Sequence, residues 1–178
     1  METVLILDFG AQYSQLIARR VREQNVYCEV KPCSISPAEI EKIAPIGIIL
    51  SGGPQSVYES VSPHVDPALF ALGIPVLGIC YGCQLMAYSL GGTVAAATEA
   101  TAREYGKTMT EFDTDSAIFR GLPASSVTWM SHGDYISQVP DGFTVTAKTA
   151  VCPTAAMACP EKKLYGVQFH PEVQHTVQ

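Results

Sequence analysis

The chain has 178 residues, of which 47% are hydrophobic, and this combination suits a single globular domain, 1–178, with a core of ordinary size. A charged fraction of 16% and a formal net charge of −6 exclude the basic surface that nucleic-acid-binding proteins need. No apolar run approaches the roughly 20 residues of a membrane-spanning helix, and the N-terminus lacks the pattern of a signal peptide. We therefore expect a cytoplasmic protein with no nucleic-acid partner and no membrane partner.

The first half of the chain alternates short, unbroken apolar runs with helical patterns. The apolar runs predict buried strands, and the spacing of apolar residues between them predicts helices, one of which has Ser36 as its N-cap. The predicted strands are 3–9, 26–30, 46–50 and 74–79, and the predicted helices are 13–21, 37–44 and 82–90.

The second half contains shorter strand patterns separated by polar turns, at 105–112, 127–131, 144–149, 155–158 and 164–169. Unbroken apolar strands that alternate with helices are typical of a parallel sheet covered on both faces. We therefore predict an α/β fold with a doubly wound, mostly parallel central sheet, flanking helices and an additional antiparallel segment in the C-terminal half.

Cys80 is a candidate for chemistry because it lies where a predicted strand ends and a predicted helix begins. Gly78 and Gly82 flank it, and a nucleophile on so sharp a turn needs small neighbours. At a helix N-terminus, unpaired N–H groups and the helix dipole favour the thiolate, which is the reactive form of cysteine. We therefore interpret Cys80 as a nucleophile.

Cys80 also has blander interpretations. The six cysteines are expected to be free thiols, most of them inert in the core, because no secretory signal is present. Cys80 and Cys83 form a C-x-x-C pair after a strand, as in a thioredoxin-like redox site, although such sites lie earlier in smaller domains. A zinc site is weaker still, because no second C-x-x-C or histidine pair completes four ligands.

His170 and Glu172 can complete a cysteine site as the base and the group that orients it. His170 is the terminal residue of the last predicted strand, and the carboxyl ends of parallel strands meet at one edge of a sheet. Cys80 and His170 can therefore approach, although 90 positions separate them. A histidine on its own is more often a surface or capping residue, which is the interpretation kept for His64 and His175.

The loop Ser51-Gly-Gly-Pro54 emerges at the same edge of the sheet. Two glycines allow a main-chain N–H to approach a substrate oxygen closely, as an oxyanion hole requires, although an ordinary turn has the same composition. The loop departs from the phosphate-binding loop of ATP pyrophosphatases at Pro54 and Gln55. Asp8-Phe-Gly10 lacks the accompanying motifs of a protein kinase, so neither segment predicts ATP binding here.

A polar cluster, Ser131-His-Gly-Asp134, ends another predicted strand and either binds a polar substrate or satisfies a loop through His132. Together with Ser51-Gly-Gly-Pro54, Gly78-Ile-Cys-Tyr-Gly-Cys-Gln84 and His170-Pro-Glu172, in that order along the chain, it resembles the motif set of the class I glutamine amidotransferases. Within that family, segments 5–13, 18–23, 131–134 and 170–176 are most similar to the amidotransferase domains that serve GMP synthesis.

The resemblance implies that Cys80 attacks the side-chain amide of glutamine, that His170 protonates the departing ammonia, and that Glu172 orients His170. It implies an oxyanion hole made by the backbone N–H groups of Gly53 and Tyr81. It also implies that the substrate's amino-acid end is bound by Gln84, Ser131, His132 and Gly133.

By the same resemblance, ammonia passes to an ATP-pyrophosphatase (synthetase) domain or subunit that uses ATP and magnesium to convert XMP to GMP. No cofactor and no metal is expected in this chain itself, and its abrupt end fits an excised domain or a separate subunit. Such a domain can be poorly active until its partner orders the site. Two other functions stay open: a glutamyl hydrolase or cysteine peptidase on a related fold, and a non-catalytic regulatory subunit.

Overall fold

The computed structural model describes residues 1–10, 13–97, 104–173 and 176. Its helical elements are α1 (Ser14–Glu23), α2 (Pro37–Ile43), α3 (Tyr81–Ser89) and the 3-10 segments η1 (Pro67–Ala71) and η3 (Pro160–Lys162). Its strands are β1 (Thr3–Asp8), β2 (Tyr27–Pro32), β3 (Gly47–Leu50), β4 (Val76–Ile79), β5 (Thr93–Ala96), β6 (Glu104–Phe112), β7 (Ser125–His132), β8 (Asp134–Gln138), β9 (Thr144–Lys148), β10 (Ala156–Cys159) and β11 (Leu164–Val167). In this part of the chain, no helix is both long and apolar enough to cross a membrane.

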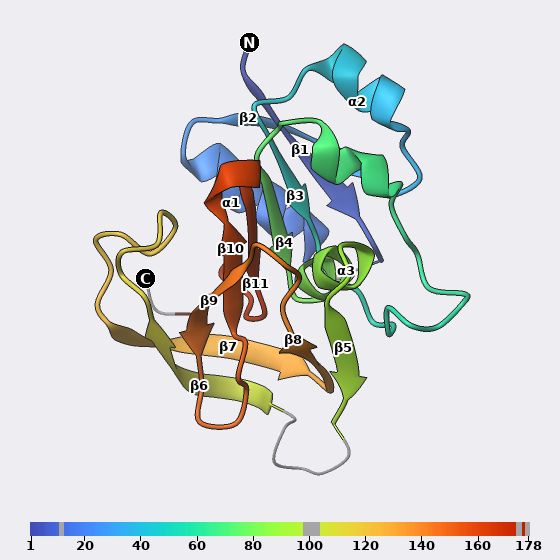
Figure 1. Ribbon diagram of the computed structural model, residues 1–178. Helices are drawn as coiled ribbons and strands as arrows, with labels where there is room; N and C mark the ends of the chain where they lie inside the picture. The colour runs from blue at the N-terminus through green and yellow to red at the C-terminus, as the bar shows by residue number, and fades with distance from the viewer. Residues whose placement is uncertain (11–12, 98–103, 174–175, 177–178) are drawn as a thin grey trace.

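The central sheet has nine strands in the order β2-β1-β3-β4-β11-β10-β9-β6-β7 (Figure 1). The strands from β2 to β11 run parallel, and from β11 to β7 each strand pairs antiparallel with its neighbour. The predicted α/β fold with an antiparallel C-terminal segment is therefore confirmed. The position of β11 is decisive for the site, because it places the last strand directly beside β4.

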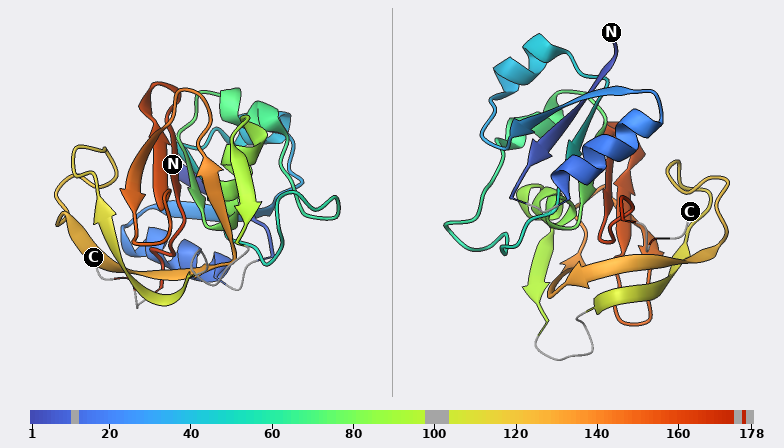
Figure 2. Two further views of the ribbon diagram at one scale, coloured as in Figure 1. Left: turned by 60° about the horizontal axis from the view of Figure 1, so that its bottom comes forward. Right: turned by 180° about the vertical axis from the view of Figure 1, so that it is seen from behind.

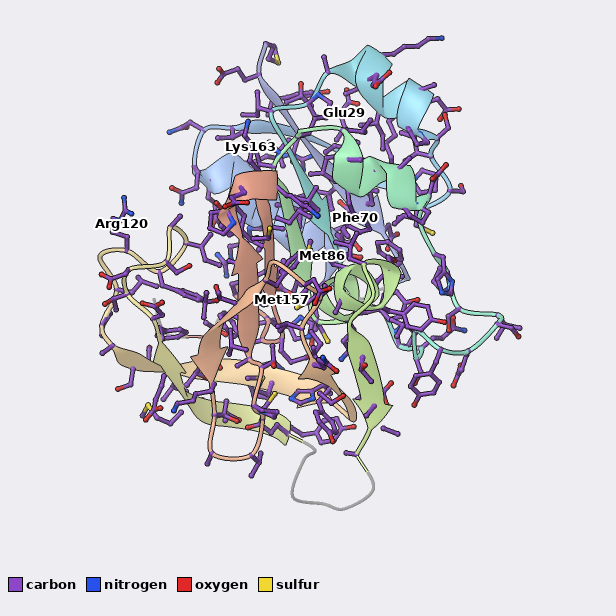
Figure 3. All side chains as sticks on the ribbon, in the orientation of Figure 1. Glu29, Phe70, Met86, Arg120, Met157 and Lys163 are labelled. Atoms are coloured by element: carbon purple, nitrogen blue, oxygen red, sulfur yellow. The ribbon has the colours of Figure 1, made fainter. Side chains whose placement is uncertain are left out.

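Helices cover both faces of the parallel part of the sheet. Helix α1 packs Ile17 and Ala18 against Ile6 of β1 on one face, which Figure 2 shows from behind. Helices α2 and α3 cover the other face, where Met86 of α3 lies in the same core cluster as Met157 of β10. Figure 3 shows these two methionines in the interior, with surface side chains such as Arg120 directed outward.

Strands β5 and β8 are not predicted by the sequence, and they form a separate two-stranded antiparallel sheet. Strand β5 has four residues and β8 has five, which is too short for an apolar run or an alternation that would identify a strand with certainty, and none of the β5 residues is fully buried. In the view of Figure 1, this two-stranded sheet lies below α3. Strand β8 begins at Asp134, immediately after the predicted substrate-binding segment 131–133.

Local capping follows the expected chemistry. Ser36 is the N-cap of α2, and its hydroxyl accepts a hydrogen bond from the Glu39 N–H at 3.2 Å. The Asp8 carboxylate accepts from the Gly10 N–H at 2.9 Å and from the Ser14 hydroxyl at 2.8 Å. Asp8 thus ties the end of β1 to the start of α1, which gives the Asp-Phe-Gly tripeptide a turn-forming role.

Candidate active site

Cys80 occupies a strained elbow between β4 and α3. Its backbone angles are φ 52° and ψ −108°, a conformation that residues other than glycine adopt rarely and at a cost of about 1–3 kcal/mol. A Cβ atom on Gly82 would lie 2.5 Å from the Leu50 carbonyl oxygen, and one on Gly78 would lie 2.6 Å from the Gly82 carbonyl oxygen. The close packing of α3 on the sheet therefore requires both glycines, as the sequence pattern predicts.

His170 reaches Cys80 because β11 and β4 are parallel neighbours, with Val167 opposite Ile79. The prediction that His170 ends the strand is wrong in detail. Strand β11 stops at Val167, the last residue paired with β10, and His170 lies in the bend beyond it. There its backbone N–H donates to the Trp129 carbonyl at 2.9 Å, which anchors the bend to β7.

Glu172 holds the His170 ring from the side away from the thiol. His170 Nδ1 donates to Glu172 Oε1 at 2.7 Å, and the two residues are only 6% and 3% exposed. Glu172 Oε2 is buried with no hydrogen-bond partner among the described residues, so the interactions of this carboxylate are concentrated on His170. Arg20 of α1 fixes the backbone, because its Nε donates to the Glu172 carbonyl at 2.9 Å.

The electrostatics of this arrangement favour a charged histidine. Burial lowers the pKa of His170, but hydrogen bonds and charge interactions with Cys80 and Glu172 outweigh burial and raise the pKa to about 10. Because Nδ1 donates to Glu172, Nε2 is the ring atom left for Cys80. An imidazolium beside a cysteine stabilises its thiolate, so the geometry suits a nucleophilic thiol.

A pocket of about 360 Å³ opens over Cys80. All the predicted binding residues line it: Gly53, Tyr81, Gln84, Ser131, His132 and Gly133. His170 and Glu172 are not among its lining residues. The structure thus brings the six predicted binding positions together around Cys80, with the His170 imidazole outside the lining of this pocket.

Gly53 lies so close to other parts of the protein that a side chain would be crowded at this position. A Cβ atom at this position would lie 3.0 Å from the Phe9 carbonyl oxygen and 3.3 Å from the Tyr81 ring. The loop is tied down at Ser51, whose hydroxyl accepts from the Phe9 N–H at 3.1 Å and whose carbonyl accepts from the Gly82 N–H at 3.1 Å. The loop and the start of α3 are therefore linked directly.

Gln168 also lies at the site, although it is not among the residues predicted from the sequence. It is fully buried, and its Nε2 donates to Cys80 Sγ at 3.5 Å. Its Oε1 accepts from Gln84 Nε2 at 3.0 Å, and Gln84 Nε2 also donates to the Asp134 carbonyl at 3.1 Å. The signal that could have identified Gln168 is a single polar residue within the apolar run that ends at Phe169.

The loop before η1 closes one side of the pocket. Ser56 Oγ donates to Asp134 Oδ2 at 2.5 Å, and the Tyr58 hydroxyl donates to Asp134 Oδ1 at 3.1 Å. His64 forms hydrogen bonds from its two ring nitrogens to the carbonyls of Ser62 and Val57, in agreement with the structural role expected for it. His175 lies outside the described residues.

The redox interpretation of Cys80 gains no support from the structure. Cys83 is fully buried in the core cluster on the α3 face, whereas Cys80 belongs to the cluster on the opposite face. Burial raises the pKa of the Cys83 thiol well above its ordinary range. All six cysteines are free, so Cys83 is best described as a core residue.

One buried group of described side chains, Glu104, His132 and Cys152, has donor atoms within 4.8 Å of one another, as a metal site would. Each of those atoms already has a hydrogen-bond partner inside the protein. Burial and the nearby Glu104 raise the pKa of Cys152 to about 12, which keeps it a neutral thiol. The group is therefore a hydrogen-bonded network.

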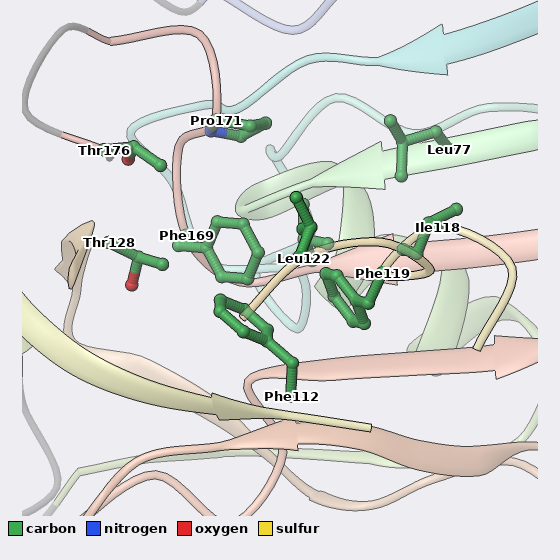
Figure 4. A pocket seen from close by; sticks show the side chains of 10 residues that line it. Leu77, Phe112, Ile118, Phe119, Leu122, Thr128, Phe169, Pro171 and Thr176 are labelled. Atoms are coloured by element: carbon green, nitrogen blue, oxygen red, sulfur yellow. The ribbon is translucent and has the colours of Figure 1, made fainter. Parts of the chain in front are cut away.

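A second, apolar pocket of about 190 Å³ lies beside the bend that carries His170 (Figure 4). Phe112, Phe119 and Phe169 form its wall, with ring centroids 4.8–6.3 Å apart. Pro171 also lines it, so the two residues that flank His170 in the chain pack into this aromatic cluster. Such packing fixes the bend that carries the histidine.

The comparisons with known proteins agree with this geometry. A family model described as glutamine amidotransferase class-I matches residues 5–178. A glutamine-hydrolyzing GMP synthase of Clostridium botulinum is 57% identical over 98% of this chain, and one of Caldanaerobacter subterraneus is 59% identical over 98%. This chain spans 34% of the length of each of these relatives.

Solved structures show the same relationship. A crystallised Thermoplasma acidophilum protein, provisionally described as one subunit of a GMP synthase, is 32% identical with a TM-score of 0.84, over 99% of this chain and 87% of that one. A Thermotoga maritima glutamine amidotransferase is 25% identical with a TM-score of 0.77, over 97% of this chain and 76% of that one. The sequence match and the shared fold together show that this chain belongs to the class I glutamine amidotransferase family.

Proposed function

We propose that this chain is the glutamine-hydrolysing component of GMP synthesis, with Cys80, His170 and Glu172 as its catalytic residues. The observation that carries the proposal is the Cys80 elbow beside a histidine held by Glu172 at 2.7 Å and charged by its surroundings. The proposal that the ammonia is used to make GMP rests on the names of the C. botulinum and C. subterraneus relatives, because both are called glutamine-hydrolyzing GMP synthases.

In the proposed reaction, Cys80 Sγ attacks the side-chain amide carbon of glutamine. The tetrahedral intermediate collapses by breaking the C–N bond, and His170 gives its proton to the nitrogen, so that ammonia leaves and a glutamyl thioester remains. His170 then takes a proton from water, the hydroxide attacks the thioester, and glutamate leaves as the C–S bond breaks. The backbone N–H groups of Gly53 and Tyr81 would stabilise the oxyanion in both steps.

Binding of glutamine falls to Gln84 and the segment 131–133, which line the pocket with Cys80. Ammonia would pass to a synthetase domain or subunit, which would bind ATP and magnesium and convert XMP to GMP. The proposal includes this synthetase partner. It also includes a cytoplasmic location and no cofactor in this chain.

The test measures glutamate release from glutamine with and without the synthetase partner. Cys80→Ala should abolish the partnered activity, whereas the matched control Cys83→Ala should retain it, because Cys83 lies in the core on the other face of the sheet. Retained activity in Cys80→Ala would show that the nucleophile is assigned wrongly.

Labelling by a diazo-ketone analogue of glutamine separates the remaining alternatives. A glutaminase should be alkylated at Cys80, as mass spectrometry of the digested protein would show. No labelling with the partner present would support a regulatory subunit, and preferential acylation by peptide or poly-glutamyl substrates would support a hydrolase or peptidase.

A further inference from the structure

Glu104 is a buried acid that the proposed mechanism does not use. It is the first residue of β6 and only 7% exposed, and the register of β6 and β7 places it directly opposite His132. Glu104 Oε1 lies 3.2 Å from His132 Nε2, and Glu104 Oε2 lies 2.8 Å from the Thr149 hydroxyl. A buried carboxylate is costly unless its oxygens are paired, and here both oxygens have partners.

The hydrogen positions in this group follow from the partners of each atom. His132 Nδ1 lies 2.8 Å from the Asp134 carbonyl, which can only accept, so Nδ1 carries a hydrogen. The Thr149 hydroxyl oxygen accepts from two backbone N–H groups of its own turn, so its hydrogen goes to Glu104 Oε2. One further hydrogen must then lie between Glu104 Oε1 and His132 Nε2, since two bare acceptors would repel at 3.2 Å.

The Asp134 carbonyl connects this group to the pocket. It accepts from His132 Nδ1 and also from Gln84 Nε2, so the two donors share one acceptor. Gln84 lines the pocket, and so does the segment 131–133. The His132 side chain itself is 1% exposed and turned inward, so its ring acts on the pocket through Asp134 and not by touching a ligand.

We propose that Glu104 is a positioning residue for glutamine binding, which holds the His132 ring so that the Asp134 carbonyl, Gln84 and the segment 131–133 keep their places in the pocket. This inference rests on the proposed function. In this proposal Glu104 neither contacts glutamine nor takes part in the chemistry at Cys80. Loss of Glu104 should therefore weaken glutamine binding without changing the reactivity of the Cys80 thiol.

The experiment compares three variants with the wild type, each assembled with the synthetase partner. Glu104→Ala removes both contacts. Glu104→Gln keeps both, because its amide nitrogen can donate to His132 Nε2 and its amide oxygen can accept from Thr149. Glu111→Ala is the matched control, since Glu111 lies on the same strand with its side chain 66% exposed.

The readouts are KM and kcat for glutamine, the rate of Cys80 labelling by the diazo-ketone analogue, and the rate of alkylation by iodoacetamide, which needs no glutamine pocket. Glu104→Ala should raise KM and slow analogue labelling by about tenfold or more, the usual scale for leaving a buried group unpaired. Its kcat and its iodoacetamide rate should stay within about twofold of the wild type, and Glu104→Gln should restore KM.

An unchanged KM in Glu104→Ala, or a loss in Glu104→Gln as large as in Glu104→Ala, would overturn the inference. A parallel fall of kcat and of the iodoacetamide rate would also overturn it, because it would indicate general damage to the site.

If circular dichroism shows that Glu104→Ala does not fold, Glu104→Asp takes its place, because the shorter side chain cannot reach both partners. A wild type that the analogue fails to label would defeat the proposed function as well, whereas labelled wild type with unaffected Glu104 variants defeats only this inference.

Discussion

Gly82→Ala should destabilise the protein and disturb the Cys80 elbow, because α3 packs directly on β3 at this point. The added methyl group would lie 2.5 Å from the Leu50 carbonyl oxygen, where about 3.3 Å is the ordinary limit for carbon against oxygen. Relief of the clash requires roughly 0.8 Å of movement between α3 and β3. The hydrogen bond from the Gly82 N–H to the Ser51 carbonyl, now 3.1 Å, would be strained as well. Overpacking and the weakened hydrogen bond together should lower the free energy of unfolding by about 2–4 kcal/mol.

Thermal denaturation followed by circular dichroism measures this cost. For a chain of this size the expected fall in Tm is about 5–15 °C. Gly47→Ala is the control, because its Cβ would meet only the Pro75 carbonyl oxygen, at an ordinary 3.7 Å, and Tm should hardly change. If the two variants melt within a couple of degrees of each other, the packing of α3 on β3 does not demand glycine and the reasoning fails.

Two further changes test the electrostatics and the capping. Glu172→Gln should lower the pKa of His170 and slow alkylation of Cys80 by iodoacetamide near neutral pH; an unchanged rate would show that the carboxylate does not support the thiolate. The stabilisation from charged His170 is complete below its ordinary pKa of 6.5 and is lost as the pH rises through about 10. The difference in unfolding free energy between wild type and Glu172→Gln should therefore shrink over that interval in urea titrations, and a constant difference would contradict the assignment. Ser36→Ala should cost about 1 kcal/mol by urea denaturation, because it removes the N-cap bond to Glu39, and Ser36→Thr should restore most of it.

The parallel half of the fold was predictable because its strands are short, largely apolar runs and its helices carry apolar residues at helical spacing, with Ser36 as the N-cap of α2. The pairing of β5 with β8 was not, because both strands are short and their partners are about 40 residues apart in sequence. The place of β11 in the middle of the sheet was also hidden. Its apolar run identifies a strand, but a run of apolar residues does not say which neighbours it will have.

The site divides in the same way. Cys80, His170 and Glu172 could be identified because each lies in a short pattern that has a chemical reason, and the structure brings them together. Their catalytic roles remain predictions. Gln168 carries one sequence signal, as a single polar residue inside an apolar run, and Glu104 carries none. The contacts of Gln168 with Cys80 and of Glu104 with His132 could not be predicted, because each is made between different strands and not between neighbours in the chain.

The insertion of β11 beside β4 has a consequence for how the protein is made. Cys80 leaves the ribosome 90 residues before His170, which at a synthesis rate of about 5–20 residues per second is roughly 5–20 seconds earlier. During that interval one edge of β4 lacks its partner, and it is exposed to unwanted pairing with other chains. Cys80 therefore cannot meet His170 until β11, the central strand of the sheet and the last to be synthesised among the described residues, has been inserted between β4 and β10.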